Sequence, residues 1–258
     1  MDNNNPIGLF DSGIGGTSIW KEIHQLLPGE STIYLADSKN APYGQKSKDE
    51  IIALSCKNTE MLLDLNAKII VVACNTATTN AIKELRAKYD VPFIGIEPAI
   101  KPAAHHSKTQ TIGILATKGT LSSELFNKAV EMYQDTHIVE QVGYGLVQLI
   151  EDGQIESKEM DRLLHTYLAP MIEANIDYLV LGCSHYPYLI PQIRKILPAH
   201  IQIIDSGQAV ARQTQKILQE KVGFGHGGHP FHTFYTNADP KVLSQIIGKE
   251  YPVIQKDF

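Results

Sequence analysis

The chain has 258 residues, of which 43% are hydrophobic, and its 23 basic and 28 acidic side chains leave a formal charge of −5. A chain of this length and apolar content can bury a full core in one large or two small domains. The sequence has no basic stripe that could neutralise phosphates, so nucleic acid is excluded as the main partner. A membrane is also excluded, because no run approaches the roughly 18 apolar residues that span a bilayer. Three cysteines are too few for a secreted fold held by disulfides, so we expect a cytoplasmic protein with free thiols.

Short apolar runs alternate with longer amphipathic stretches along the chain. The apolar runs predict strands over residues 7–10, 32–35, 69–73, 93–96, 111–115, 137–141, 178–181 and 202–204. The amphipathic stretches predict helices over residues 17–27, 48–66, 79–88, 122–133, 158–175, 190–197 and 207–222. This alternation predicts an α/β fold with mainly parallel sheets, in which ligands bind where strands end and helices begin.

The second half of the chain repeats the first. The segment "PIGLFDSGIGGTS" resembles "TIGILATKGTLSS", and the pairs Cys74 with Cys183 and Glu97 with Asp205 follow in the same order and at nearly the same separation. We therefore predict two pseudo-symmetric α/β lobes, residues 1–97 and 98–206, with the active site in the cleft between them. Residues 207–258 have no repeat partner, and we expect them to return to the first lobe.

Each lobe carries one cysteine at a predicted strand-to-helix junction. Cys74 precedes Asn75-Thr76, and Cys183 precedes Ser184-His185. A small molecule held between the lobes would have a thiol on either side, and racemisation needs two acid/base groups that flank one carbon. The reference pKa of a thiol is about 8.5 and falls at a helix N-terminus or beside a proton acceptor, so we expect either cysteine to be able to carry a thiolate.

Three other interpretations of these cysteines stay open at this point. A buried cysteine at a strand end is often only a small hydrophobic residue. Cys183 and His185 could bind zinc with His226, His229 and His232, although the usual ligand spacings are missing, and we predict no metal. His185 could also serve as the base of a cysteine hydrolase, although a residue two positions along an extended chain points alongside the thiol rather than at it.

The glycine-rich segment "DSGIGGTS" does not indicate a nucleotide. Ser18 stands where the last glycine of G-x-G-x-x-G would be, and the P-loop lysine is missing. Its backbone N–H groups at a helix N-terminus are expected to bind a substrate carboxylate instead. Of the remaining conspicuous side chains, we interpret Cys56 and Trp20 as packing residues and His105-His106 as an exposed connection between the lobes.

Eight motifs in order show a resemblance to a known family. They are "GLFDSGIGGTS", "YLADSKNAPYG", "VVACNTAT", "IGIEPAIKPA", "ILATKGT", "LIEDG", "LVLGCSHYPYLIPQI" and "IIDSG". On these motifs the chain resembles the glutamate racemases of the aspartate/glutamate racemase superfamily. The resemblance implies two pseudo-symmetric lobes that interconvert L- and D-glutamate without pyridoxal phosphate or metal, and it implies that the D-glutamate supplies bacterial peptidoglycan.

The resemblance also assigns roles to residues. It implies that Cys74 takes the proton of D-glutamate and Cys183 that of L-glutamate, that Asp11 supports the first cysteine, and that Glu151 and His185 support the second. The positions that match substrate-binding residues are Asp11, Ser12, Tyr43, Gly44, Asn75, Thr76, Ser184 and His185. Hydroxyl, amide and backbone donors suit the two carboxylates of glutamate, and Asp11 suits its ammonium.

The sequence departs from the family at two places. Ser184 stands where the family usually has threonine, and Gly143-Tyr144 replaces a cysteine–proline pair ahead of "LIEDG". Aspartate racemase, or another member with two cysteines, is the alternative activity, because the cysteine pair specifies the reaction and not the substrate side chain. A two-lobed binding protein is the alternative of a different class. Glutamate is the predicted small-molecule partner, and a homodimer is left open.

Overall fold

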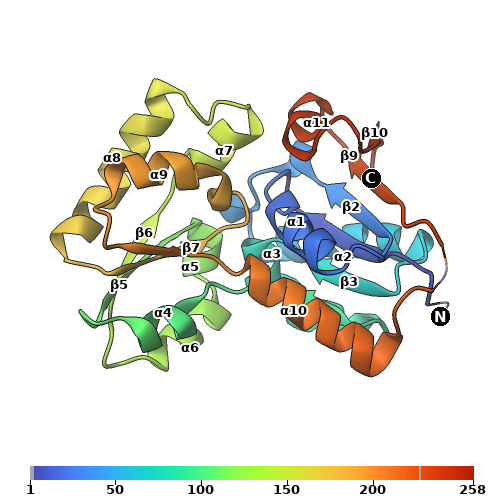
Figure 1. Ribbon diagram of the computed structural model, residues 1–258, viewed down its shortest axis with the longest axis horizontal. Coiled ribbons are helices and arrows are strands. Elements are labelled where there is room, and N and C mark those ends of the chain that lie inside the picture. The colour runs from blue at the N-terminus through green and yellow to red at the C-terminus, as the bar shows by residue number, and fades with distance from the viewer. Residues whose placement is uncertain (1–2, 227) are drawn as a thin grey trace.

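The computed structural model describes residues 3–226 and 228–258, which form two parallel β-sheets in two lobes (Figure 1). The larger sheet has the strand order β10-β9-β2-β1-β3-β4, and the smaller sheet has the order β6-β5-β7-β8. The strands are β1 (Ile7–Asp11), β2 (Thr32–Ala36), β3 (Ile69–Val72), β4 (Phe93–Gly95), β5 (Thr111–Ala116), β6 (His137–Val142), β7 (Tyr178–Gly182), β8 (Gln202–Ile204), β9 (His232–Thr236) and β10 (Val253–Gln255).

Helices connect these strands and cover both faces of each sheet. The α-helices are α1 (Thr17–Leu26), α2 (Lys48–Asp64), α3 (Asn75–Lys88), α4 (Ile100–His106), α5 (Lys118–Leu121), α6 (Glu124–Glu131), α7 (Leu146–Glu151), α8 (Lys158–Glu173), α9 (Ile190–Ile196), α10 (Gly207–Ile217) and α11 (Lys241–Ile247). Because a parallel sheet is covered on both faces, its strands are apolar throughout, as the sequence pattern indicates.

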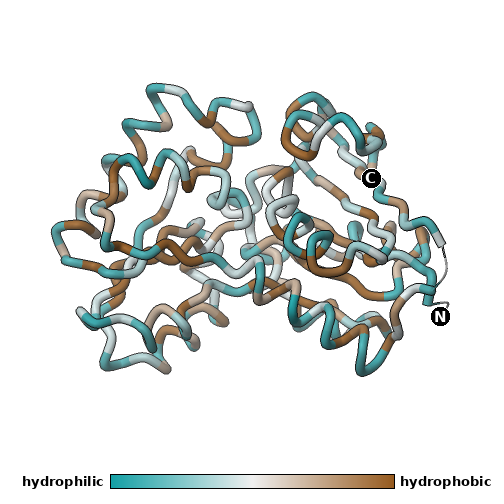
Figure 2. Tube along the Cα trace, viewed as in Figure 1, coloured by the Kyte–Doolittle hydropathy of each residue, from teal (hydrophilic) through white to brown (hydrophobic). Residues whose placement is uncertain are grey.

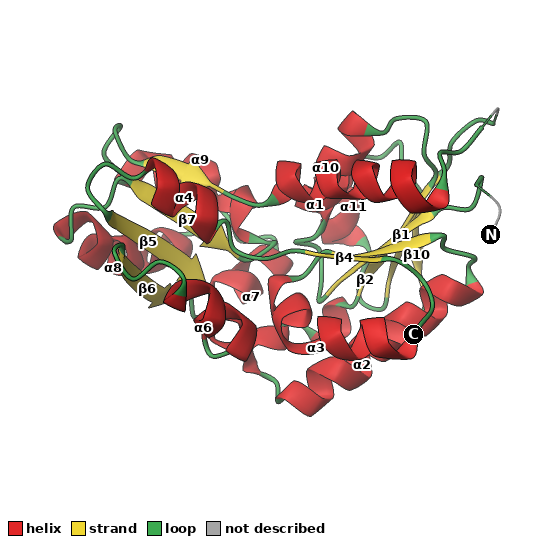
Figure 3. Ribbon diagram, turned by 90° about the horizontal axis from the view of Figure 1, so that it is seen from below, coloured by secondary structure: helices red, strands yellow, loops and turns green. Residues whose placement is uncertain are grey.

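In the first lobe, α1 and α10 lie on one face of the larger sheet and α2 and α3 lie on the other (Figure 3). Successive strand residues point to opposite faces. Leu9 and Val71 therefore pack with Ile19 of α1, whereas Phe10 packs in a second buried cluster with Leu62 of α2. This double-sided burial makes the strand ends rigid platforms for the residues that follow them.

The second lobe follows the same plan. Helices α8 and α9 cover one face of the smaller sheet, and α4 and α6 cover the other (Figure 1). Leu179 packs with Leu164 of α8, while its neighbour Val180 packs with Phe126 of α6. In Figure 2 the hydrophobic stretches follow the central strands of both lobes. In the part of the chain that the structure describes, no helix combines the length and the hydropathy needed to cross a membrane.

The two lobes share one strand order, which confirms the predicted fold class of two pseudo-symmetric α/β lobes. The order β2-β1-β3-β4 corresponds to β6-β5-β7-β8. Gly8 of β1 and Gly113 of β5 occupy equivalent places, and a Cβ added at either would come within 3.0 Å of the covering segment, at Ala67 in one lobe and Met171 in the other. The repeated Ile-Gly pair in the sequence therefore marks a repeated close approach between strand and cover.

The chain after α10 extends the larger sheet. β9 pairs in parallel with β2, and β10 pairs with β9 at the outer edge (Figure 1). Two segments, residues 96–99 and 205–206, connect the lobes and lie against each other, because the Ser206 hydroxyl donates a hydrogen bond to the Glu97 carbonyl oxygen. Both connections therefore run along the same side of the interface between the lobes.

Some predicted elements differ from the observed ones. The helix predicted from residue 79 begins at Asn75, with Cys74 as its N-cap. The helix predicted over residues 122–133 corresponds to α6 alone, which is shorter at both ends. His105-His106 are exposed, as expected, but they end helix α4 and are not an irregular connection. Helices α4, α5, α7 and α11 and strands β9 and β10 were not predicted.

Candidate active site

The carboxyl ends of the two sheets meet between the lobes. In each sheet the chain leaves the two central strands, β1 and β3 or β5 and β7, toward opposite edges of the sheet, and parallel sheets bind ligands at this point. Asp11 ends β1, Cys74 follows β3, Thr117 follows β5 and Cys183 follows β7. The contact between lobes is direct, because the Ser184 hydroxyl donates to Asp11 Oδ1 at 3.2 Å.

The glycine-rich loop after β1 allows this close contact. A Cβ added at Gly13 would overlap the Glu151 carboxylate, and one added at Gly15 would overlap the His185 ring. Any side chain at these two positions would push the second lobe away from the first. The glycines therefore bring the loop against the two residues that were predicted to support Cys183.

The backbone amides of the same loop bind carboxylates of the protein itself. The Ile14 N–H donates to Glu151 Oε1 at 2.7 Å, and the Gly16 N–H donates to Asp11 Oδ2 at 2.8 Å. The expectation that the loop amides bind a substrate carboxylate is wrong for these two groups. The start of α1 does bind negative charge, as the helix dipole favours. The bound groups are the carboxylates of Glu151 and Asp11, which belong to the protein itself.

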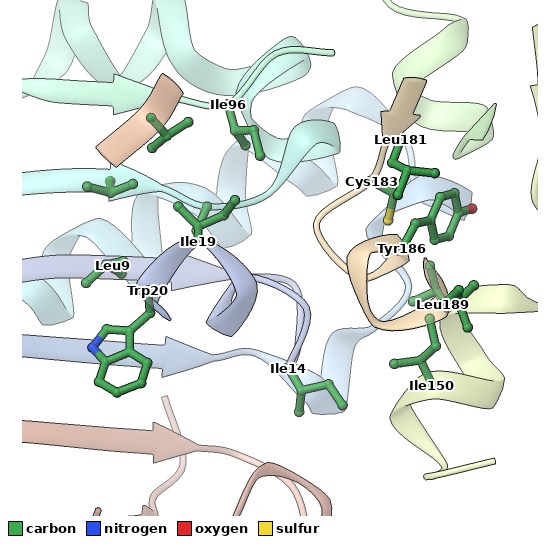
Figure 4. Close-up of a cluster of buried hydrophobic side chains, with 14 of the residues drawn as sticks. Leu9, Ile14, Ile19, Trp20, Ile96, Ile150, Leu181, Cys183, Tyr186 and Leu189 are labelled. Carbon is green, nitrogen blue, oxygen red and sulfur yellow. The ribbon is translucent and has the colours of Figure 1, made fainter. Parts of the chain in front are cut away.

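Apolar side chains from both lobes meet beside the loop (Figure 4). Ile14 of the first lobe belongs to one buried cluster with Ile150 and Leu189 of the second. Cys183 lies at the end of β7 next to Tyr186 in the same cluster. This contact keeps water away from the site, where electrostatic interactions are correspondingly strong.

The first thiol, Cys74, lies at the N-terminus of α3 and is 3% exposed. Its Sγ accepts a hydrogen bond from the Ala77 N–H at 3.4 Å and lies 3.6 Å from Ser12 Oγ. Burial, followed by the negative charge of Asp11, raises the pKa of Cys74 well above its usual range, although the Ala77 amide and Ser12 oppose the shift. The expected lowering of the pKa is therefore wrong for Cys74, which is a protonated thiol near neutral pH.

The second thiol, Cys183, has an imidazole beside it instead of a carboxylate. His185 Nδ1 lies 3.8 Å from Cys183 Sγ, and His185 Nε2 lies 2.6 Å from Glu151 Oε1. Because Glu151 accepts, Nε2 carries a proton and Nδ1 faces the thiol. Burial by itself lowers the pKa of His185, but hydrogen bonds to Cys183 and Glu151 and the charges of Asp11 and Glu151 outweigh it and raise this pKa well above its ordinary value. The imidazole can therefore take the proton of Cys183.

Asp11 lies between the two thiol environments and is fully buried. Burial raises the pKa of Asp11, and the positive charge of His185 and the Gly16 N–H lower it in part. Its Oδ2 lies 3.9 Å from His185 Nδ1. Asp11 is therefore in contact with both lobes and close to both acid/base units.

Asn75 and Thr76 lie in the first turn of α3, directly after Cys74. Both Asn75 side-chain polar atoms are buried without a hydrogen-bond partner among the described residues, so this amide can donate and accept further hydrogen bonds. The Thr76 hydroxyl lies 2.8 Å from Thr117 Oγ1, and Thr117 Oγ1 lies 3.0 Å from Thr120 Oγ1. The sequence analysis missed Thr117 and Thr120, although Thr117 follows β5 as Asp11 ends β1 and could have been found by the same rule.

Tyr43 and Gly44 lie in the loop after β2, which also reaches the second lobe. A Cβ added at Gly44 would come within 2.7 Å of Thr117 Cβ, so this position too requires close approach. The Tyr43 hydroxyl donates to Asp37 Oδ2 at 2.5 Å and accepts from Asn58 Nδ2 at 3.1 Å. The structure thus brings Gly44 to the interface, while the Tyr43 hydroxyl is held by its own lobe.

Two other interpretations of conspicuous residues can be compared with the structure. Among the described residues, no group of three or more histidine, cysteine, aspartate and glutamate side chains could hold a metal ion. His226 and His229 are exposed, whereas His232 lies in β9 and its Nδ1 is 2.9 Å from Thr32 Oγ1. Trp20 is buried against Phe234, which confirms its packing role.

Residues 7–214 match the family described as Asp/Glu/Hydantoin racemase. The chain belongs to this racemase family. The glutamate racemase of Herpetosiphon aurantiacus is 45% identical to this racemase over 214 residues, which are 83% of this chain and 84% of the relative. The glutamate racemase of Pseudomonas entomophila is 43% identical over 244 residues, which are 94% and 92% of the two chains.

Solved structures of glutamate racemases superpose on this racemase over almost its full length. The enzyme from Bacillus anthracis has a TM-score of 0.89 at 30% identity and covers 99% of this chain and 98% of its own. The Escherichia coli enzyme, solved with L-glutamate and the activator UDP-MurNAc-ala, has a TM-score of 0.88 at 30% identity and covers 98% of both chains. The Francisella tularensis enzyme, solved with D-glutamate, has a TM-score of 0.86 at 27% identity and covers 99% of this chain and 98% of its own. The resemblance noted from the motifs is confirmed, and the protein is an enzyme of the racemase class.

Proposed function

We propose that the protein racemises glutamate by a two-thiol acid/base mechanism that needs neither metal nor pyridoxal phosphate. The observation that supports it best is the pair of buried thiols at equivalent strand ends, Cys74 after β3 and Cys183 after β7, each with a different proton acceptor beside it. A pair of titratable groups in contrasting environments is a sign of divided acid and base roles.

In the proposed direction from L-glutamate, the thiolate of Cys183 removes the Cα proton. The Cα–H bond breaks, its electron pair stays on Cα as a carbanion, and the proton goes to Sγ. The Cys74 thiol then delivers its own proton to the opposite face, so that its S–H bond breaks and a new Cα–H bond forms. From D-glutamate the two thiols exchange roles. Hydrogen bonds from buried donors stabilise the charge that develops in the transition state.

The pocket chemistry supports a substrate with two carboxylates. The free amide of Asn75 and the hydroxyls of Ser12, Thr76 and Ser184 are donors for carboxylate oxygens, and Asp11 is an acceptor for an ammonium. Two similar solved enzymes were obtained with L- and D-glutamate, which favours glutamate over aspartate. We further propose a cytoplasmic role in supplying D-glutamate for peptidoglycan, and we leave a homodimer to be tested by sedimentation.

Deuterium incorporation tests the mechanism. Pure L-glutamate is converted in heavy water, and both enantiomers are recovered during the first turnovers. If one thiol removes the proton and the other returns one equilibrated with solvent, D-glutamate carries deuterium from the start while unreacted L-glutamate stays almost unlabelled. Equal early labelling of both enantiomers would show that one base works on both faces, which would refute the two-thiol proposal.

Two further measurements test substrate and cofactor. Racemisation of aspartate at a rate comparable to that of glutamate would contradict the substrate proposal. Treatment with a chelator and with hydroxylamine is expected to leave the rate unchanged. Loss of activity that zinc or pyridoxal phosphate restores would contradict the cofactor-free mechanism.

A further inference from the structure

Each lobe places a serine on the carboxylate that belongs to the other lobe. Ser184 of the second lobe donates to Asp11 of the first, and Ser38 of the first lobe donates to Glu151 of the second. Ser184 is already among the predicted substrate-binding residues. Ser38 lies within the motif "YLADSKNAPYG", but the resemblance to the family assigns no role to it.

Ser38 is one of two first-lobe donors that hold Glu151. The Ser38 hydroxyl donates to Oε2 at 2.7 Å, and the Ile14 N–H donates to Oε1 at 2.7 Å. The remaining donor, His185 Nε2, comes from the second lobe and lies 2.6 Å from Oε1. The Glu151 side chain is only 9% exposed, so the loss of a donor leaves a largely buried carboxylate oxygen with one partner fewer.

These contacts form a continuous path from the first lobe to the second thiol. Ser38 holds Glu151, Glu151 sets the tautomer and orientation of His185, and His185 Nδ1 faces Cys183 Sγ at 3.8 Å. Cys74 lies outside this path, because its nearest polar partners are Ser12 and the Ala77 amide. The path therefore ends directly at Cys183 and approaches Cys74 only through Asp11, whose Oδ2 lies 3.9 Å from His185 Nδ1.

We propose that Ser38 is a positioning residue for proton transfer at Cys183, acting through Glu151 and His185. The proposal rests on the two-thiol racemisation proposed above. It implies that the acid/base unit of Cys183 is complete only while the lobes are in contact. Two of the three observed donors to the Glu151 carboxylate, the Ile14 N–H and the Ser38 hydroxyl, come from the first lobe. Removing Ser38 should therefore impair the Cys183 step and spare the Cys74 step.

The test is the primary deuterium isotope effect on kcat/KM, measured from [2-²H]-L-glutamate and from [2-²H]-D-glutamate. For Ser38→Ala we expect kcat/KM to fall by about 10- to 100-fold, the effect of losing a hydrogen bond to a charged group. The fall is equal in both directions because the equilibrium constant of racemisation is one. The isotope effect should rise from L-glutamate, where Cys183 breaks the Cα–²H bond, and fall from D-glutamate, where Cys74 does.

Ser18→Ala is the matched control. The Ser18 hydroxyl also bridges the lobes, donating to the Ser184 carbonyl oxygen at 2.9 Å, but it does not contact Glu151. We expect this variant to keep the wild-type ratio of the two isotope effects, and Ser38→Thr, which keeps the hydroxyl, to restore that ratio as well. Circular dichroism checks that each variant is folded.

The outcomes separate this inference from the proposed function. A wild-type protein that does not racemise glutamate refutes the function itself. Wild-type racemisation combined with a Ser38→Ala variant whose two isotope effects are unchanged or move together refutes the role of Ser38 and leaves the function standing. If Ser38→Ala proves too unstable to purify, Ser38→Cys, which keeps a weak donor of similar size, gives the same comparison.

Discussion

The two thiols differ most in their immediate neighbours. Burial, followed by the charge of the neighbouring Asp11 carboxylate, raises the pKa of Cys74, whereas Cys183 lies beside an imidazole with a raised pKa. The first arrangement favours a protonated thiol, and the second places a possible proton acceptor, His185 Nδ1, 3.8 Å from Cys183 Sγ. In the mechanism proposed above, Cys183 therefore removes the proton of L-glutamate and Cys74 delivers one.

Replacing either thiol should abolish racemisation. For Cys74→Ala and Cys183→Ala we expect the rate to fall by at least about 10²–10⁴-fold, because each change removes one general acid/base group. Racemisation is followed by circular dichroism of the substrate, and far-ultraviolet spectra check the fold. Cys56→Ala is the control, since Cys56 packs in α2 away from the site. Substantial activity in either active-site variant would show that a single base suffices.

Asp11→Asn should lose activity and gain stability at neutral pH. The pKa of Asp11 is raised above its unfolded value of 3.8, so folding favours the protonated form. The stability contributed by this group is present below pH 3.8 and is lost as the pH rises through the raised folded-state pKa, so the ionised carboxylate opposes folding at neutral pH. Asparagine keeps acceptor and donor atoms for Gly16 and Ser184.

Thermal unfolding at about pH 4 and about pH 7 measures the effect of Asp11→Asn. The variant should melt several degrees above the wild type at the higher pH and close to it at the lower pH. A lower melting temperature than the wild type at neutral pH would mean that the hydrogen bonds of the carboxylate outweigh its desolvation.

At this scale, pattern alone predicted part of the site. Cys74 and Cys183 could be found because each follows a central strand, whereas the role of Asp11, which ends β1, came from the resemblance to the family. Ser38 could not be selected, because its partner Glu151 lies in the other lobe, whereas Thr117 directly follows β5 and could have been found by the strand-end rule. The thiol pKa was predicted from the helix N-terminus, a local feature, whereas burial between the lobes determines it.

The loop between β1 and α1 gives a prediction for an element. Gly13→Ala should displace Glu151, and a displacement of about 1 Å at a catalytic unit can lower the rate by about 10²-fold. Each lobe should stay folded, so the melting temperature should fall only by the amount that a weaker contact between the lobes causes. Gly29→Ala is the control, because an added Cβ there meets no described atom within 4 Å. Equal rates in the two variants would show that the loop tolerates a side chain.

Elements were predictable where their periodicity was long. The 16 residues of α8 show a clear apolar stripe, whereas α7 has six residues and begins after Gly145 in a left-handed conformation. The start of α3 was predicted too late because threonines favour other conformations. Here Thr78 and Thr79 donate their hydroxyl protons to carbonyl oxygens of Val72 and Asn75 and so fit the helix.

At the scale of the whole molecule, a buried ion pair joins distant parts of the chain. Lys68 Nζ lies 2.7 Å from Glu30 Oε2, and the two side chains are 0% and 4% exposed. Lys68 also donates to the carbonyl oxygens of Asn3 and Gly223, and Glu30 accepts from the Gly225 N–H. The pair thus ties the beginning of the chain and the segment that leads to β9 onto the first lobe.

Lys68→Ala should destabilise the protein by about 3–5 kcal/mol, because it leaves Glu30 buried without its partner. Lys48→Ala is the matched control, since Lys48 pairs with Glu84 at 3.7 Å on the surface, where such a pair contributes about 0–1 kcal/mol. Chemical denaturation measures both. A loss below about 1 kcal/mol for Lys68→Ala would indicate that water reaches Glu30.

The repeat in the sequence predicted the two-lobed architecture, but it could not predict the order of strands. Parallel strands connected by helices can be arranged in several orders, and the sequence patterns of β1 and β3 do not say which strands are neighbours. β9 and β10 were missed because they have no counterpart in the second lobe to support them, and β10 has only three residues. Their addition makes the two sheets unequal.

The closed contact between the lobes also determines how the thiols meet reagents. Cys74 and Cys183 are 3% and 6% exposed, so an alkylating agent such as iodoacetamide can reach them only when the lobes move apart. Cys56, which is partly exposed on α2, reacts without that motion and serves as an internal reference. The rate at which Cys74 and Cys183 are alkylated, relative to that of Cys56, should therefore report how often the lobes separate. A bound substrate that holds the lobes together should slow the first two thiols and leave the third unchanged, and equal slowing of all three would show that access depends on something other than the separation of the lobes.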